Sequence, residues 1–367
     1  MLSRQIAPKL LNYETPFYLY DIDLLRRTLE SLVYESEKYG YRVHYAIKAN
    51  YDDRILGVIR EYGLGIDCAS GNEIRKALEL GFDPKGIVYA GVGKRDKELR
   101  YAIERNIMAI NCESIEELHV VDAFSAECGR CTDVALRINP DIDPKTNHCI
   151  DTGQADSKFG ISYEEVLEHV DDIKSLKNIN IIGLHLHIGS QIRELHVFEN
   201  MCDKVNVIVA NLSSLGFNLR FVDVGGGLGI NYDVPENEPI PNFASLFSIV
   251  QKHLDVGSRE VHFEFGRSIV GECGELITRV LFNKTTATGR KLLIVDASMT
   301  ELVRPAMYGS YHNIENITSQ EIAVDKYTVV GTACESTDVF DENVTLRKTR
   351  RGDLLTLKSA GAYGMSM

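Results

Sequence analysis

Residues 42–50 read RVHYAIKAN, a mainly apolar, β-prone run that ends on the charged residue Lys48. The composition of residues 42–47 predicts a buried β-strand. Seven more such runs follow along the chain, separated by stretches of helical period, at 64–67, 86–89, 108–111, 132–138, 180–188, 218–224 and 261–264. Helical stretches lie between them at 72–80, 114–128 and 194–215, among others. Eight strands in succession predict a parallel sheet closed into an α/β (β/α)8 TIM barrel, not an open doubly wound sheet.

The pattern changes after residue 271. Residues 276–282, 291–296, 323–331 and 353–357 have strand character, with turns but little helical period between them. They predict a C-terminal β-sandwich or β-barrel domain. A strand at 17–20 precedes Asp21, a plausible N-cap for a helix that continues to Gly40, and this strand could join the β domain. We therefore expect a barrel over 21–270 and a β domain made of 1–20 plus 271–367.

Composition limits the classes of partner. Apolar residues make up 44% of the 367 residues, enough for a large core. The chain carries 40 basic against 53 acidic residues, a net charge of −13, and no basic run of five residues. This balance argues against nucleic acid or an anionic membrane as a main partner. A local cluster of arginine and backbone N–H groups could still hold a small phosphate.

The termini and cysteines indicate a reduced, cytoplasmic protein. The polar N-terminus, MLSRQIAPKLLNYETP, does not resemble a signal peptide, and no apolar run is long enough to span a bilayer. The cysteines are scattered and form no disulfide framework: Cys68, Cys112, Cys128, Cys131, Cys149, Cys202, Cys273 and Cys334. The spacing of Cys128 and Cys131 suits a metal or redox site. Without a second pair, surface thiols are the preferred interpretation.

Polar residues stand where the barrel strands are predicted to end. In a (β/α)8 barrel the carboxyl ends of the strands and the loops after them build the active site. Here these positions hold Lys48, Asp67, Cys68, Arg137, Asn139, His185, His187, Gly225, Gly226, Gly227, Glu264, Gly266 and Arg267. We expect these residues to converge.

Lys48 has two interpretations. A strand-end lysine can extend to solvent or pair with an acid. Alternatively, burial beside other cations lowers its pKa and supplies the free amine that Schiff-base chemistry needs. The glycines at 225–227 allow backbone N–H groups to approach a phosphate, although a glycine run alone also fits a flexible loop. Gly266 and Arg267, after the eighth strand, form a second phosphate-type element.

Together these elements favour pyridoxal 5′-phosphate. Glu264 could keep the pyridine nitrogen protonated, His187 could stack on the ring, and Ser190 could donate to the phosphate. A rival hypothesis makes His185 and His187 metal ligands, because alternate strand residues share one face. Metal-dependent barrel hydrolases usually carry such a histidine pair on the first strand, whereas in this chain the pair lies on the sixth predicted strand. We therefore expect no metal.

Eight motifs, in order, resemble the alanine-racemase-like (fold type III) pyridoxal-phosphate decarboxylases, and among them the enzymes that act on diaminopimelate. They are YAIKAN, DCAS, HLHIGSQ, DVGGGLG, EFGRSIV, LVRPAMY, CESTD and GAYG, spread over nearly the whole chain. The resemblance implies that Lys48 binds the cofactor covalently, while His187 stacks on the ring and Glu264 holds its nitrogen. The cofactor-binding set it implies is Lys48, Asp67, Arg137, His187, Ser190, Gly225, Gly226, Gly227, Glu264, Phe265, Gly266, Arg267 and Tyr363.

The resemblance also implies a homodimer with active sites shared across the interface. Cys334 would be a catalytic proton donor to the partner's site, with Lys48 and His187 as the other catalytic residues. The substrate-binding set would be Arg267, Arg304, Tyr308, Glu335 and Tyr363. The expected reaction converts meso-2,6-diaminopimelate to L-lysine and CO2, the last step of lysine biosynthesis.

The substrate-binding residues separate the relatives. Diaminopimelate carries an amino group and a carboxylate at its far end, for which Glu335 and Arg304 offer one receptor each. Ornithine, arginine, lysine and carboxynorspermidine remain alternative substrates, and Arg304 has the alternative of a solvated surface charge. A non-catalytic pyridoxal-phosphate-binding barrel would lack the second domain. An alanine racemase would use a tyrosine as its second acid–base group.

The chain departs from the family pattern in three places. Phe265 stands where the family usually has proline, and Thr337 where it has glycine. Both substitutions could alter the local backbone. The chain ends at Met367, whereas the family normally continues past this point, so we expect the C-terminal end of the β domain to be truncated.

Overall fold

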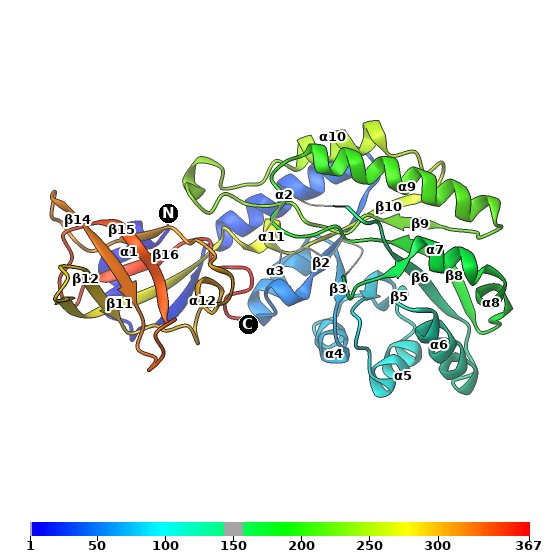
Figure 1. Ribbon diagram of the computed structural model, residues 1–367, viewed down its shortest axis with the longest axis horizontal. Helices are drawn as coiled ribbons and strands as arrows, with labels where there is room; N and C mark the ends of the chain where they lie inside the picture. The colour runs from blue at the N-terminus through cyan, green and yellow to red at the C-terminus, as the bar shows by residue number, and fades with distance from the viewer. Residues whose placement is uncertain (1, 143–156) are drawn as a thin grey trace. The chain divides into compact units, whose positions relative to one another are not determined.

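The computed structural model describes residues 2–142 and 157–367, so Cys149 lies outside the described residues. The chain divides into two compact units (Figure 1). The barrel unit comprises Leu29–Gly229 and Asn242–Gly266, and the β unit comprises Met1–Thr28, Ile230–Pro241 and Arg267–Met367. Residues 21–28, 230–241 and 267–270, which we expected in the barrel domain, fall within the β unit.

Eight parallel strands form the closed barrel of the barrel unit. Their order is β5-β4-β3-β2-β10-β9-β8-β6, and a pairing of β5 with β6 closes the ring. They are β2 (Arg42–Ala46), β3 (Gly65–Cys68), β4 (Ile87–Tyr89), β5 (Ala109–Cys112), β6 (Thr132–Asn139), β8 (Ile179–His185), β9 (Phe221–Asp223) and β10 (Glu260–Phe265). A two-residue strand, β7 (Ile161–Ser162), pairs with β6 outside the ring. The predicted TIM barrel is confirmed, strand by strand.

Helices connect the barrel strands (Figure 1). Local capping starts several of them: Ser70 accepts a hydrogen bond from the Glu73 backbone, and Ser114 accepts one from the Glu117 backbone. The predicted N-cap, Asp21, accepts from the Leu24 backbone at 2.9 Å. The helices are α2 (Ile22–Glu37), η1 (Ile47–Ala49), α3 (Asp53–Glu61), α4 (Gly71–Glu79), η2 (Pro84–Gly86), α5 (Asp96–Arg105), α6 (Ile115–Glu127), α7 (Tyr163–Glu168), α8 (Val170–Ser175), α9 (His196–Ser214) and α10 (Phe243–His253).

Strand alternation separates a polar interior from an apolar exterior in the barrel, as β10 shows. Phe263 and Phe265 face outward, where their rings lie 4.9 and 5.7 Å from those of Phe247 and Phe243 on α10. The alternate residues His262 and Glu264 face the interior. A hydrophobic outer layer therefore supports a ring of buried titratable groups.

The β unit is built on a seven-stranded sheet in the order β13-β16-β11-β12-β14-β15, with β1 added antiparallel to β11. Its strands are β1 (Phe17–Tyr20), β11 (Gly274–Thr285), β12 (Lys291–Val295), β13 (Ile314–Asn316), β14 (Val324–Val330), β15 (Val339–Arg347) and β16 (Leu354–Leu357). Its helices are α1 (Leu2–Leu10), η4 (Pro235–Asn237), α11 (Arg267–Val270) and α12 (Arg304–Tyr308). The expected mainly-β second domain, joined by the strand at 17–20, is confirmed.

Strand β13 was not predicted from the sequence, and neither were helix α1 and strand β15, for which a physical reason is visible. Helix α1 forms although Pro8 lies within it, because Ala7 and Leu10 bury against Ile277 and Leu354. Strand β15 lies at the end of the sheet order, and one of its edges has no paired strand among the described residues. An edge strand tolerates charged residues, which obscures its strand signal in the sequence. Tertiary packing decides both elements.

Within the described residues, no helix combines the length and the apolar character needed to cross a bilayer.

Candidate active site

Lys48 lies in η1, directly after β2, and its amine meets a buried acid. Its Nζ is 2.8 Å from Asp67 Oδ2 at the end of β3. Asp67 is fully buried, and its Oδ1 has no hydrogen-bond partner among the described residues. Burial and the nearby Glu264 charge raise the pKa of Asp67 despite Lys48. Lys48 thus follows the first interpretation, because it pairs with an acid that can accept its proton. Its side chain is 42% exposed, so the expected burial beside other cations is wrong.

Glu264 lies buried in the barrel interior, between His185 and Asn111. Its Oε2 lies 3.1 Å from His185 Nε2, and its Oε1 accepts from Asn111 Nδ2 at 3.5 Å. Burial opposes ionisation, but the charge and hydrogen bond of His185, with Lys48 and His187, bring the pKa of Glu264 well below its usual range. Glu264 is therefore a buried carboxylate anion.

Asp223, on the neighbouring strand, shows the opposite shift. Its Oδ1 accepts from the Gly225 backbone at 2.9 Å, and its Oδ2 has no partner among the described residues. Burial, and then the charge of Glu264, raise the pKa of Asp223 far above the usual value. Like charges in one low-dielectric site push their pKa values apart, so Glu264 keeps the charge.

His187 is held neutral beside the glycine run. The Gly226 backbone N–H donates to His187 Nδ1 at 3.2 Å, so that nitrogen carries a lone pair. Burial first, and then the charges of Lys48 and Arg137, lower the pKa of His187 to about 3. A neutral, oriented imidazole suits stacking on an aromatic ring.

The loop after β9 is shaped for close backbone approach. A Cβ on Gly226 would lie 1.9 Å from the Glu264 carbonyl oxygen, and one on Gly225 would lie 2.4 Å from that of Leu186. Gly225 and Gly227 have φ values of 69° and 104°, which side-chain-bearing residues rarely adopt. Only glycine fits at these positions of the loop.

Arg137, predicted to bind the cofactor, is buried against an acid. Its Nη1 lies 2.7 Å from Glu113 Oε1, and its guanidinium lies 4.7 Å from the centre of the Phe159 ring. Glu113 also accepts from the Gly91 and Gly160 backbones. Like Asn111, Glu113 was missed by the sequence interpretation, although both stand at or just after the end of the fourth predicted strand.

A second group of predicted residues lies in the β unit, around Tyr232. Its hydroxyl accepts from Arg267 Nη1 at 2.6 Å and from Arg304 Nη1 at 3.0 Å. Arg304 also lies 3.0 Å from His312 Nε2 and 3.4 Å from Ser310 Oγ. Both guanidinium groups are buried, at 5% and 4% exposure. Arg304 is therefore not a solvated surface charge.

His312 fixes the orientation of Arg304. Its Nδ1 lies 2.8 Å from the Lys358 carbonyl oxygen, so Nδ1 carries the proton and Nε2 accepts from Arg304. Burial, then the Arg304 charge, lower the pKa of His312 to about 3. Neither Tyr232 nor His312 has a local sequence signal that marks it as functional.

The other predicted residues take various positions. Tyr363, with a φ of 56°, places its ring 4.9 Å from the Arg267 guanidinium, and Tyr308 ends α12 partly buried. Cys334 and Glu335 are exposed on the segment between β14 and β15. Phe265 turns its side chain outward, so only its backbone and that of Gly266 could serve a ligand. Ser190 lies partly buried in the loop after β8.

The residues of the barrel unit fit pyridoxal phosphate. They offer an amine beside a proton acceptor, a buried carboxylate anion for a pyridinium nitrogen, a neutral imidazole, and a glycine cradle that a Cβ would fill. The orphaned Oδ1 of Asp67, the acid beside Lys48, shows that a polar group remains to be satisfied there.

A family model described as "Pyridoxal-dependent decarboxylase, pyridoxal binding domain" matches residues 25–271. This chain belongs to the pyridoxal-dependent decarboxylases. The expected resemblance and the expected cofactor, pyridoxal phosphate, are thereby confirmed.

Relatives within this family match over nearly the full chain. The diaminopimelate decarboxylase of Bacteroides thetaiotaomicron is 46% identical, covering 96% of this chain and 92% of its own length. The crystal structure of diaminopimelate decarboxylase from Helicobacter pylori complexed with L-lysine superposes with a TM-score of 0.92 at 36% identity, covering 98% of this chain and 90% of that one. An arginine decarboxylase from a Chlorella virus, at 21% identity and a TM-score of 0.87, shows the fold alone, over 99% of this chain and 95% of that one.

Proposed function

We propose that this chain decarboxylates meso-2,6-diaminopimelate to L-lysine and CO2, the last step of lysine biosynthesis. The observation that carries the substrate choice is the pair of buried guanidinium groups, Arg267 and Arg304, that share the hydroxyl of Tyr232. Buried cations held by a neutral acceptor favour an anionic ligand group, such as the distal carboxylate of diaminopimelate. Ornithine has no such group.

The barrel residues prepare the cofactor. When bound, pyridoxal phosphate supplies the electron sink that accepts the electron pair left by the departing carboxyl group. Lys48 Nζ is its attachment point, and Asp67, 2.8 Å away with a raised pKa, takes the ammonium proton. Glu264, ionised by its surroundings, holds a proton on the pyridine nitrogen. His187 would stack on the cofactor ring, and the loop at Gly225–Gly227 would hold the phosphate.

The β unit recognises the substrate and completes the proton transfers. Arg267 and Arg304, with Tyr308 and Tyr363, bind the distal carboxylate, and Glu335 binds the distal ammonium group. We propose a cytoplasmic homodimer in which the partner subunit's Cys334 protonates the reacting carbon. The exposure of this thiol on its surface segment supports such an exchange between subunits.

The test measures CO2 release by the holoenzyme from meso-diaminopimelate, L-ornithine, L-arginine and L-lysine. We expect release from diaminopimelate only, with loss of activity in Lys48→Ala. Lys38→Ala is the matched control, because Lys38 is an exposed lysine paired with Glu35. Release from ornithine or arginine in preference, or full activity of Lys48→Ala, would overturn the proposal.

A further inference from the structure

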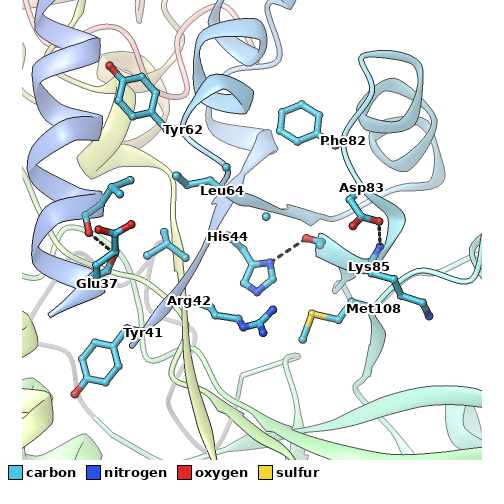
Figure 2. Close-up of a pocket in the computed structure, with 16 residues that line it drawn as sticks. Glu37, Tyr41, Arg42, His44, Tyr62, Leu64, Phe82, Asp83, Lys85 and Met108 are labelled. Carbon is cyan, nitrogen blue, oxygen red and sulfur yellow. Dashed lines mark hydrogen bonds between the residues drawn. The ribbon is translucent and has the colours of Figure 1, made fainter. Parts of the chain in front are cut away.

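The opposite end of the barrel contains a second polar site. A cavity of about 460 Å³ lies at the N-terminal ends of β2, β3 and β4, and His44 lines it (Figure 2). The Gly86 carbonyl oxygen lies 3.1 Å from His44 Nδ1, and a dashed line in Figure 2 marks a hydrogen bond of the His44 ring. A carbonyl oxygen only accepts, so Nδ1 carries the proton and His44 Nε2 carries a lone pair.

His262, on the adjacent strand β10, is held in the complementary tautomer. Its Nε2 lies 3.2 Å from Glu260 Oε2, on a carboxylate side chain that is 48% exposed. The carboxylate accepts, so Nε2 carries the proton and His262 Nδ1 carries a lone pair. The hydrogen bonds to Gly86 and Glu260 thus leave His44 Nε2 and His262 Nδ1 unprotonated.

These two unprotonated nitrogens face each other. His44 Nε2 and His262 Nδ1 are 3.2 Å apart, and both rings are buried. A carboxylate oxygen of Asp223 lies within 4.8 Å of a ring nitrogen of each histidine. Asp223 Oδ2 is the buried oxygen that has no hydrogen-bond partner among the described residues. Two lone-pair nitrogens therefore face each other with no hydrogen between them, and a proton on the Asp223 carboxyl group could serve only one of the two.

A shared proton does not resolve this arrangement. One proton would join the two imidazoles but leave Asp223 Oδ2 unsatisfied. A cation satisfies all three groups at once.

We propose that His44 Nε2, His262 Nδ1 and Asp223 bind a divalent transition-metal ion, with Zn²⁺ as the best-matched ion. Two imidazoles and a carboxylate are a common Zn²⁺ ligand set. A Zn–N bond of about 2.05 Å in tetrahedral geometry separates two ligand nitrogens by roughly 3.3 Å. The observed 3.2 Å matches this separation. The hydrogen bonds to Gly86 and Glu260 are the outer partners that orient metal-binding histidines.

The surroundings of both histidines are shaped to hold them. A Cβ on Gly65 would lie 2.4 Å from His44 Nδ1, so only glycine leaves room for that ring. The Phe221 ring stacks on His262 at 4.7 Å and 9°. A Cβ on Gly183 would lie 2.3 Å from that Phe221 ring.

The ion would join three adjacent strands, β2, β10 and β9, which carry His44, His262 and Asp223. Asp223 also lies within 4.8 Å of the ligand atoms of His185 and Glu264. The ion would therefore take the place of the proton on Asp223 and add positive charge near Glu264, which favours the carboxylate form of Glu264. Its role would be structural and electrostatic, and the cavity at His44 would supply its entry path.

The test uses tag-free holoenzyme and Zn²⁺ as the probe. Elemental analysis after dialysis should find about one Zn²⁺ per chain, and Co²⁺ substitution should give the visible absorption of a tetrahedral site with nitrogen ligands. His44→Gln and His262→Gln should each lose the ion. Glu260→Gln changes an exposed side chain and should fold normally, yet weaken Zn²⁺ binding about 10- to 100-fold.

Two controls separate this site from incidental binding. The double variant Cys128→Ser, Cys131→Ser removes the surface thiol pair, and His119→Gln removes an exposed histidine paired with Asp172. Neither should change the stoichiometry. Less than about 0.1 Zn²⁺ per chain after incubation with excess Zn²⁺, or equal Zn²⁺ binding by wild type and Glu260→Gln, would overturn the proposal. All these readouts are independent of decarboxylase activity.

Discussion

Replacing Tyr232 by phenylalanine tests how the two buried arginines of the β unit are held. The change removes one oxygen, which accepts hydrogen bonds from Arg267 at 2.6 Å and Arg304 at 3.0 Å. The ring remains, so no cavity forms. The guanidinium groups also keep their contacts with the ring, at 5.9 and 5.1 Å from its centre.

The magnitude follows from burial and from the remaining partners. A hydrogen bond with a charged donor contributes about 1.5–3 kcal/mol, and two such bonds would contribute about 3–6 kcal/mol. Arg304 keeps His312 and Ser310 as partners, which offsets part of the loss. At 5% and 4% exposure, water cannot readily replace the hydroxyl. We expect the free energy of unfolding to fall by about 2–4 kcal/mol.

Urea unfolding of the holoenzyme, followed by circular dichroism, measures this loss. Steady-state CO2 release gives the second readout. Because the hydroxyl orients two arginines that we propose bind the substrate, we expect KM for diaminopimelate to rise more than kcat falls. Tyr13→Phe is the control, since Tyr13 is a 62% exposed tyrosine of the same unit. It should change stability by less than about 0.5 kcal/mol.

A Tyr232→Phe enzyme within about 0.5 kcal/mol of wild type, with unchanged KM, would refute the reasoning. That result would mean that the hydroxyl does not position Arg267 and Arg304. A fall in kcat at constant KM would also contradict a positioning role in substrate binding.

Three further predictions concern single residues. Gly226→Ala should weaken cofactor binding and destabilise the fold by about 2 kcal/mol or more, since its Cβ would lie 1.9 Å from a carbonyl oxygen. Gly57→Ala is the control: Gly57 has open space around it, so the change should stabilise α3 by about 0.5–1 kcal/mol. Glu264→Gln should retain bound cofactor, measured by its absorbance, but slow CO2 release about 100-fold or more, because an amide cannot hold the pyridinium proton by charge. The pKa of His312 falls from 6.5 to about 3 on folding, so the unfolded chain binds the extra proton and stability decreases as pH falls through this window. His312→Gln should therefore reduce the loss of unfolding free energy between about pH 7 and pH 5 by about 2 kcal/mol, measured by urea titration at both pH values.

Much of the barrel could be predicted because its signals are local. Each strand is a short apolar run, and each helix has an apolar period, so the order of elements is visible without any contact information. The same order placed Lys48, Asp67 and Glu264 at strand ends. Asn111 ends a predicted strand as well, and the strand-end rule would have included it had it been applied to every strand.

The sequence alone determined the eight-fold alternation, the polar strand ends and the family motifs, because each depends on residues close together in the chain. Only the tertiary structure decided which polar groups share a site. Barrel closure brings His44 within 3.2 Å of His262, and the β unit joins Tyr232 to Arg267 and Arg304. These pairs have no common period or spacing. Their meeting depends on strand order, register and burial, which also fix the tautomers and pKa values that the chemistry requires.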